Sequence, residues 1–192
     1  MLLRPDGIHR SQKPPMTRYH PALVALHWIM AIMIIVALIF GRFALAPLDN
    51  ADPQKLEGLT AHMTIGVMVG LLLILRLVVR VKSEKPPHAQ TGNALLDMVG
   101  VATHWLLYTL VAGMVLSGLG TAIVNGLFPI VFGGSGDAIP ANMIETAPRL
   151  AHGTISMLLM ALVALHIAAA IYHLFILRDS LFRRMWFGNR RG

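Results

Sequence analysis

The chain has 192 residues, of which 56% are hydrophobic and 13% are charged, with a formal net charge of +7 and no cysteine. A soluble domain carries about 25% charged residues, so this composition is that of a membrane protein. The lack of cysteine excludes disulfides, thiolate-bound iron–sulfur clusters and covalent haem attachment through a C-x-x-C-H motif. A redox cofactor would therefore have to be held by histidine or, less readily, by methionine.

Residues 1–20 are basic and rich in proline, but no apolar run follows the basic residues. A signal peptide needs such a run, so we expect a disordered N-terminal segment instead, with Met16 as a second candidate for the start of translation. Four stretches then carry the ~20 mostly apolar residues that a helix needs to cross a bilayer. These stretches are residues 23–45, 59–81, 95–124 and 150–177.

Backbone groups in lipid must bond within their own segment, so each stretch is predicted to be a helix. We expect an all-α fold with one transmembrane four-helix bundle over residues 21–185 and a basic C-terminal tail over residues 186–192. The connections predicted between the helices are 46–58, 82–94 and 125–148. The third is long and rich in glycine and proline, which is more typical of a functional or mobile loop than of a plain link.

Basic residues gather on one predicted side of the membrane. Most of the 16 Lys and Arg residues lie in the N-terminal segment, near the second connection or in the C-terminal tail, and only Arg42, Lys55 and Arg149 lie on the other side. By the positive-inside rule, both termini are predicted to be cytoplasmic. The positive charge thus indicates topology and contact with lipid headgroups, and we expect no nucleic-acid partner.

Histidines inside the spans are the main functional signal. Six of the nine histidines lie in the spans or at their ends: His27, His62, His104, His152, His166 and His173. A single histidine in a membrane helix usually makes an ordinary interhelical hydrogen bond. Six of them would each need a partner, and an ionisable side chain at that depth is a functional candidate by default.

His152 and His166 lie fourteen residues apart on the last span. On an α-helix this spacing puts both rings on one face, about 21 Å apart along the axis. Two rings stacked at two depths favour two stacked cofactors, and haem iron is the cofactor expected for neutral imidazole in such a bundle.

Depth along the helices predicts how the rings pair. His62 and His152 share the outer level, so they are expected to pair. His166 lies at the inner level with His27 and His104, which depth does not separate. His173 is on the same helix as His166 and cannot approach the same iron from the opposite side.

Two glycines follow His62 on its own helix face. Gly66 and Gly70 lie four and eight residues after it. Their spacing fits a small-x-x-x-small helix contact, and it equally fits clearance for a flat macrocycle beside its ligand.

Other kinds of site match the pattern less well. Zinc prefers a tight cluster of three or four ligands rather than pairs at two depths. A proton-coupled transporter without haem would normally carry Asp or Glu inside its spans, and only Asp97 lies near one. An axial methionine ligand is the minor alternative among the twelve methionines.

The combined pattern resembles the bacterial cytochrome b561 family of di-haem membrane cytochromes, from Arg18 to Met185. The matching positions are Arg18-Tyr19, Leu26-His27-Trp28, His62 with Gly66, Arg76, Arg80, His104-Trp105, His152, His166, His173, Arg178-Asp179 and Arg184-Met185. The glycine-rich stretch 133–136 is not part of the family pattern.

The resemblance implies two haem b groups with assigned ligands. The outer haem would lie between His62 and His152, and the inner haem between His27 and His166. Around them the implied cofactor-contacting residues are Gly66, Gly70, Arg76 and Arg80. His104 and His173 would lie near the inner haem, where relatives bind quinone, and could supply protons for quinone reduction.

Short members of this family are similar to superoxide oxidase. The resemblance therefore implies a multi-pass protein of the bacterial inner membrane that passes electrons from periplasmic superoxide to ubiquinone. Arg42, Lys55 and Arg149 could attract the anion, although the acidic first connection opposes them and haem propionates or lipid headgroups are equally suitable partners. The alternative is a non-catalytic electron conduit or membrane anchor that serves a dehydrogenase or a periplasmic cytochrome.

Overall fold

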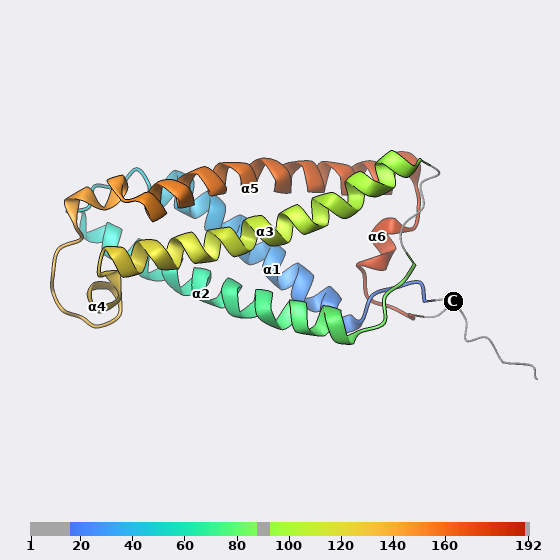
Figure 1. The fold of residues 1–192 in the computed structure, drawn as a ribbon, viewed down its shortest axis with the longest axis horizontal. Helices are drawn as coiled ribbons and strands as arrows, with labels where there is room; N and C mark the ends of the chain where they lie inside the picture. Colours follow the sequence, from blue (N-terminus) through green and yellow to red (C-terminus); the bar gives the residue numbers. More distant parts are fainter. Residues whose placement is uncertain (1–15, 88–92, 191–192) are drawn as a thin grey trace, which may run out of the picture.

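The structure, a computed structural model, describes residues 16–87 and 93–190. It is all-helical, as predicted (Figure 1). Four helical segments are long and apolar enough to cross a membrane. They are α1 (Pro21–Ile39) with the π-helix η1 (Phe40–Leu45), α2 (Pro53–Lys82), α3 (Ala94–Val124), and α5 (Ala147–Ile171) with the π-helix η3 (Tyr172–Leu177). The predicted disorder of the N-terminal segment falls mainly on residues 1–15, which lie outside the described residues.

Helix α2 begins six residues earlier than the sequence analysis predicted. Asp52 is its N-cap, because the Asp52 side chain accepts a hydrogen bond of 2.8 Å from the backbone N–H of Gln54, and Pro53 is the first helical residue. Aspartate before proline is a strong start signal for a helix. The first connection is therefore residues 46–52, and the polar residues that follow belong to the helix.

The third connection is largely ordered as a cap over one end of the bundle. It contains α4 (Leu127–Val131) and the 3-10 helix η2 (Ala141–Glu145). Leu127 is 2% exposed and Met143 is 4% exposed, and both pack with Leu45 in one apolar cluster. The stretch expected to be a functional or mobile loop thus carries its own buried side chains.

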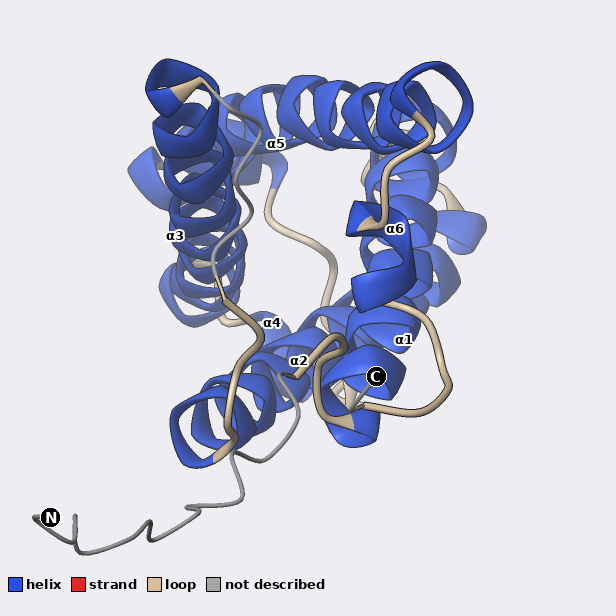
Figure 2. Ribbon diagram, turned by 90° about the vertical axis from the view of Figure 1, so that its right-hand side faces the viewer, coloured by secondary structure: helices blue, strands red, loops and turns tan. Residues whose placement is uncertain are grey.

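The four long segments form the four sides of the bundle when it is viewed along its axis (Figure 2). Helix α3 packs along α5, and α1 packs along α2. A second apolar cluster takes buried residues from all four long helices, namely Met30, Leu38, Val69, Leu73, Val111 and Leu159. This packing positions the histidines of all four helices relative to one another.

The two ends of the bundle differ. The start of α1, the end of α2, the start of α3 and the short helix α6 (Leu181–Arg184) lie together at what we term the terminal end (Figure 1). The opposite end carries the cap and is termed the α4 end. Which end faces the cytoplasm remains the prediction made from charge.

Candidate functional site

Two histidines from different helices face one another near the α4 end. The ring centroids of His62 on α2 and His152 on α5 are 6.1 Å apart, and the ring planes are inclined by 82°. Both side chains are partly buried. The structure thus brings together the two rings that depth assigned to one level.

Hydrogen bonds orient the His152 ring. Its Nδ1 lies 3.1 Å from the carbonyl oxygen of Met114 and 3.1 Å from the hydroxyl oxygen of Ser117, both on α3. Because a carbonyl can only accept, Nδ1 carries the proton in this bond and Nε2 keeps its lone pair. Metal-bound histidines are commonly held in this way, with the second nitrogen donating to a carbonyl.

The His62 ring lacks such a partner. Its Nδ1 is buried and has no hydrogen-bond partner among the described residues. A buried polar atom left unpaired costs about 1–3 kcal/mol. This Nδ1 lies against η1, 3.3 Å from the position that a Cβ on Gly41 would take.

Glycines make room for both rings. A Cβ placed on Gly41, in η1, would lie 2.9 Å from Cε1 of His62. A Cβ placed on Gly118, on α3, would lie 3.1 Å from Cε1 of His152. The sequence analysis missed both residues, because a glycine in an apolar span has no signal of its own until the neighbouring helix is placed. π-Helical turns such as η1 are frequent at functional sites.

Three histidines meet nearer the terminal end. The ring centroid of His166 lies 6.4 Å from that of His27 and 5.6 Å from that of His104. Depth did not decide whether His27 or His104 pairs with His166, and these two distances do not decide it either. His104 is exposed and its Nδ1 lies 2.6 Å from the Gly100 carbonyl oxygen of its own helix, whereas His27 is partly buried.

His173 lies apart from these rings and pairs with an acid. Its Nδ1 is 2.5 Å from Oδ2 of Asp179, and the other carboxylate oxygen of Asp179 accepts a bond of 2.9 Å from the Leu181 backbone N–H. Burial raises the pKa of Asp179, but the bonds from His173 and Leu181 outweigh it, so this pKa lies below its usual range. The sequence analysis recognised both His173 and Asp179 as family positions, but it did not predict that they pair.

Arg76 and Arg80, predicted to contact the cofactor, both lie close to the ring of Tyr108. The Arg76 Nε donates to the Tyr108 hydroxyl at 3.0 Å, and its Nη1 donates to the Leu23 carbonyl at 2.7 Å. The guanidinium carbons of Arg76 and Arg80 lie 5.9 Å and 5.7 Å from the centroid of the Tyr108 ring. These contacts join α2 to α3 and α1, and Tyr108 is a partner that sequence reasoning missed.

The two glycines after His62 have different surroundings. A Cβ on Gly70 would lie 2.9 Å from Cγ1 of Val115, so this residue provides a close contact with α3. A Cβ on Gly66 would meet no atom within 4 Å. The helix-contact interpretation therefore describes Gly70, and space for a bound group remains the interpretation for Gly66.

The three basic residues at the α4 end differ in burial and in hydrogen bonding. Lys55 is 6% exposed, and its Nζ donates to the carbonyls of Leu45 and Leu48 at 3.0 Å and 2.9 Å. It thus satisfies backbone groups at the end of η1. Arg149 is partly buried, and its charge acts on both His62 and His152. Arg42 is exposed.

The ring spacing fits bis-histidine coordination of iron. A bond between a metal and an imidazole nitrogen is about 2 Å long, so two rings on opposite sides of one metal ion have centroids about 6 Å apart. The separations of 6.1 Å at one level and 6.4 Å or 5.6 Å at the other agree with this value. No cluster of three or more His, Cys, Asp or Glu suited to a metal ion occurs within 16–87 and 93–190. With the His152 Nε2 left free by the bond from Nδ1 to Met114, the residues fit a haem held between opposed pairs.

The chain is similar to known membrane cytochromes over most of its length. A family model described as prokaryotic cytochrome b561 matches residues 18–188. The chain is 28% identical to cytochrome b562 of Cereibacter sphaeroides over 91% of this chain and 97% of the relative. It is 25% identical to cytochrome b561 homolog 2 of Escherichia coli over 88% of this chain and 90% of the relative. It is 20% identical to the probable superoxide oxidase CybB of Yersinia pestis over 88% of this chain and 95% of the relative.

Proposed function

The chain belongs to the prokaryotic cytochrome b561 family, and from this membership we propose that it is a di-haem superoxide:ubiquinone oxidoreductase. The family and the four spanning helices make it a multi-pass protein of the bacterial inner membrane that transfers electrons through haem b. The superoxide activity is proposed by analogy with the relative from Yersinia pestis, whose name is probable superoxide oxidase.

The observation that carries the proposal is the set of opposed histidines at two levels. We assign His62 with His152 to the outer haem, supported by their 6.1 Å separation and by the bond from His152 Nδ1 to the Met114 carbonyl, which leaves Nε2 free. We assign His27 with His166 to the inner haem, supported by the family pattern and by the greater burial of His27 compared with His104. When bound, haem b supplies one-electron transfer, and with histidine on both faces it offers no open position to dioxygen.

Charge at the α4 end supports an anionic electron donor. Arg149 is the cation whose charge acts on both outer rings, while Lys55 is already bonded to backbone carbonyls. Superoxide would approach Arg149 and leave as dioxygen after giving up one electron. A positively charged recess raises the association rate of a small anion, and added salt lowers that rate.

Residues at the terminal end would serve the electron acceptor. Reduction of a quinone to a quinol takes two electrons, which two superoxide anions provide, and two protons from the surrounding water. His104, whose ring lies 5.6 Å from that of His166, and His173 are the proposed proton donors. The carboxylate of Asp179 holds His173 through Nδ1, which leaves Nε2 as the nitrogen able to exchange a proton.

Haem content tests the ligand assignment. The purified protein should contain two haem b per polypeptide, and His62→Ala or His152→Ala should remove one of them and leave the spectrum of the other unchanged. His104→Ala should keep both haems and slow quinone reduction. Loss of a haem in His104→Ala, with two retained in His27→Ala, would show that the inner assignment is wrong.

Superoxide decay tests the activity. In the presence of a ubiquinone analogue, the wild-type protein should accelerate the decay of superoxide and form quinol in a ratio of one to two superoxide anions. Arg149→Gln should lower the second-order rate constant about tenfold at low salt, and the exposed Arg42→Gln should change it little. Decay at the background rate, with both haems present, would refute the superoxide activity.

One observation favours the conduit as a second candidate function. The cap at the α4 end is ordered, yet Phe132 is 50% exposed and Ile144 is 58% exposed on it. Exposed apolar side chains on an ordered surface suit a protein partner. A protein that leaves superoxide untouched but is reduced rapidly by a periplasmic cytochrome would belong to this class.

A further inference from the structure

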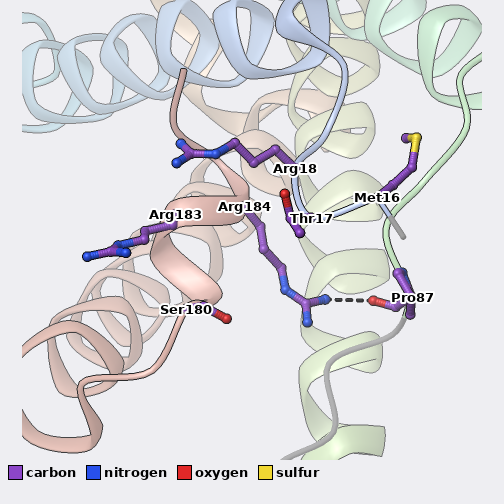
Figure 3. A pocket seen from close by; sticks show the side chains of 7 residues that line it. All are labelled: Met16, Thr17, Arg18, Pro87, Ser180, Arg183 and Arg184. Carbon is purple, nitrogen blue, oxygen red and sulfur yellow. Dashed lines mark hydrogen bonds between the residues drawn. The ribbon is translucent and has the colours of Figure 1, made fainter. Parts of the chain in front are cut away.

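A basic cavity lies at the terminal end, outside the histidine pairs. Its volume is about 370 Å³, and its lining comes from three separate parts of the chain. Figure 3 shows the lining residues, which are Met16, Thr17, Arg18, Pro87, Ser180, Arg183 and Arg184. Neither the family match nor the proposed electron transfer gives this cavity a role.

Backbone hydrogen bonds hold the walls of the cavity together. The Thr17 N–H donates to the Arg190 carbonyl at 2.7 Å, and the Tyr19 N–H donates to the Arg184 carbonyl at 3.1 Å. The Arg184 guanidinium donates to the Pro87 carbonyl at 2.6 Å and so joins the second connection to the C-terminal segment. The cavity is therefore an open recess bordered by three segments that these hydrogen bonds hold together.

One side of the cavity is built around Arg18. Its Nη1 donates to the carbonyls of Trp186 and Phe187 at 3.3 Å and 2.8 Å. Gly188 allows this placement, because a Cβ there would lie 2.9 Å from the guanidinium carbon and its φ is +144°. A side chain at position 188 would thus be strained and would also displace Arg18.

The two bonded arginines retain donors for a ligand. A guanidinium has five N–H donors in a planar fork, and the bonds to carbonyls described above involve only Nη1 of Arg18 and of Arg184. In Figure 3 the Arg184 side chain runs between Thr17 and Ser180, and the Ser180 hydroxyl adds a further donor, while the guanidinium groups of Arg18 and Arg183 point away from that of Arg184 and contribute charge. The Thr17 hydroxyl already donates to the Arg190 carbonyl at 3.1 Å. Planar forks of this kind bind phosphate oxygens in pairs.

The acidic groups nearby do not cancel this charge. Asp179 acts on Arg184, but its carboxylate is bonded to His173 and to the Leu181 N–H. Arg190 adds a further cation beside the cavity and donates to the Glu84 carbonyl at 3.2 Å. Arg18, Arg183, Arg184 and Arg190 therefore outnumber Asp179 and Glu84 around the cavity.

The cavity lies at the level where lipid headgroups are expected. Trp28 lies at the end of the second turn of α1 and donates from its indole nitrogen to the Met185 carbonyl at 2.9 Å. Trp186 and Phe187 follow and are 50% and 54% exposed. Tryptophan collects at the boundary between hydrocarbon and headgroups, and basic recesses on the cytoplasmic side of a membrane protein bind anionic headgroups.

We infer that this cavity is a phosphate-binding site that takes the headgroup of an anionic phospholipid. Arg184 contacts the phosphate oxygens, the hydroxyl of Ser180 adds a donor, and Arg18 and Arg183 add positive charge at the rim. The cavity falls in the usual range for small-ligand sites, about 300–1,000 Å³, and has room for a phosphoglycerol group rather than for a bare phosphate alone. The bound headgroup would tie the N-terminal segment to the C-terminal segment. The inference depends on the membrane location and not on the haem or superoxide assignments.

Lipid binding to the purified holoprotein tests the inference. Native mass spectrometry would count retained lipid, and thermal unfolding would be followed in nanodiscs of phosphatidylcholine with and without phosphatidylglycerol. Phosphatidylglycerol should bind and raise the unfolding temperature, and Arg184→Gln or Arg18→Gln should weaken binding about tenfold. Lys82→Gln is the control, because it removes one positive charge from an exposed residue at the same end and outside the cavity.

Two further variants separate loss of the site from loss of the fold. Ser180→Ala leaves the hydrogen bonds described above intact and should still weaken binding, while Gly188→Ala should do so by displacing Arg18. Inorganic phosphate tests for a soluble ligand. If phosphate raises the unfolding temperature and phosphatidylglycerol does not displace it, the cavity binds phosphate but the lipid headgroup is not its ligand. Equal lipid retention in the wild-type, Arg184→Gln, Ser180→Ala and Lys82→Gln proteins would overturn the site.

Discussion

Gly41 lies directly against the His62 ring, so that a Cβ at position 41 would come within 2.9 Å of Cε1 of that ring. The π-helical turn of η1 sets this approach, because it presents the bare face of the glycine to α2. The orientation of one proposed ligand therefore depends on a residue of another helix. This dependence leads to the first prediction.

Gly41→Ala should cost the protein one haem. The added methyl group would push the His62 ring away from His152, and the protein should retain about one haem per polypeptide with the inner spectrum intact. Haem content and the reduced-minus-oxidised spectrum measure this change. Gly100→Ala is the matched control, because a Cβ there meets no atom within 4 Å, and it should retain both haems.

Gly66→Val tests whether the open side of α2 receives a bound group. The protein itself leaves the space around this position empty to 4 Å, so the haem-free chain should accept the larger side chain with little change in unfolding temperature. Haem binding should fall if the macrocycle uses that space. Full haem content in Gly66→Val would instead assign the space to lipid or to packing.

Asp179 should make the C-terminal segment sensitive to acid. A pKa lowered by folding means that the carboxylate stabilises the folded segment fully above its unfolded pKa of about 3.9. This stabilisation is lost as the pH falls through the lower, folded value. Asp179→Asn should remove this acid transition, which can be measured through the fluorescence of Trp186 in the haem-free protein. The control is Asp137→Asn, at an exposed residue, which should leave the transition unchanged. An identical acid transition in wild type and Asp179→Asn would contradict the assignment.

Trp28→Phe should loosen the C-terminal segment from α1. The substitution keeps an aromatic ring near Phe182 and Trp186 but removes the 2.9 Å bond to the Met185 carbonyl. The loss of one such bond costs about 1 kcal/mol and should raise tryptic cleavage at Arg183 and Arg184 about fivefold. Trp105→Phe, at a residue 59% exposed, serves as the control and should be cleaved at the wild-type rate.

Periodicity and depth predicted much of the site from residues alone. The spacing of His152 and His166 placed both rings on one helix face, and helix direction placed His62 at the level of His152. Both statements depend only on the helix rise and on the number of crossings, which an apolar pattern determines well. In the structure His62 lies beside His152 and His27 lies beside His166, and the role of these residues as haem ligands stays a prediction.

Contacts between side chains of different helices could not be predicted from periodicity and depth. The close approach of Gly41 to His62, the bond from His152 to Met114, and the placement of Arg76 and Arg80 around Tyr108 each join residues of different helices. The early start of α2 was missed because Asp52-Pro53 was assigned to a connection. An Asp-Pro pair occurs both in loops and at helix N-termini, so the sequence around it does not show which of the two it forms.

The sequence by itself determined the four spanning helices, their order, the two levels of histidine and the family. Hydrophobic length and the 3.6-residue repeat are local properties, so they can be read along the chain. Only the tertiary structure decided which glycines face a ring, which carbonyl holds His152, that Lys55 is bonded to the end of η1, and that Arg18 and Arg184 line one cavity. These features depend on the rotation of each helix about its axis and on how the chain ends fold back, which packing between distant residues sets.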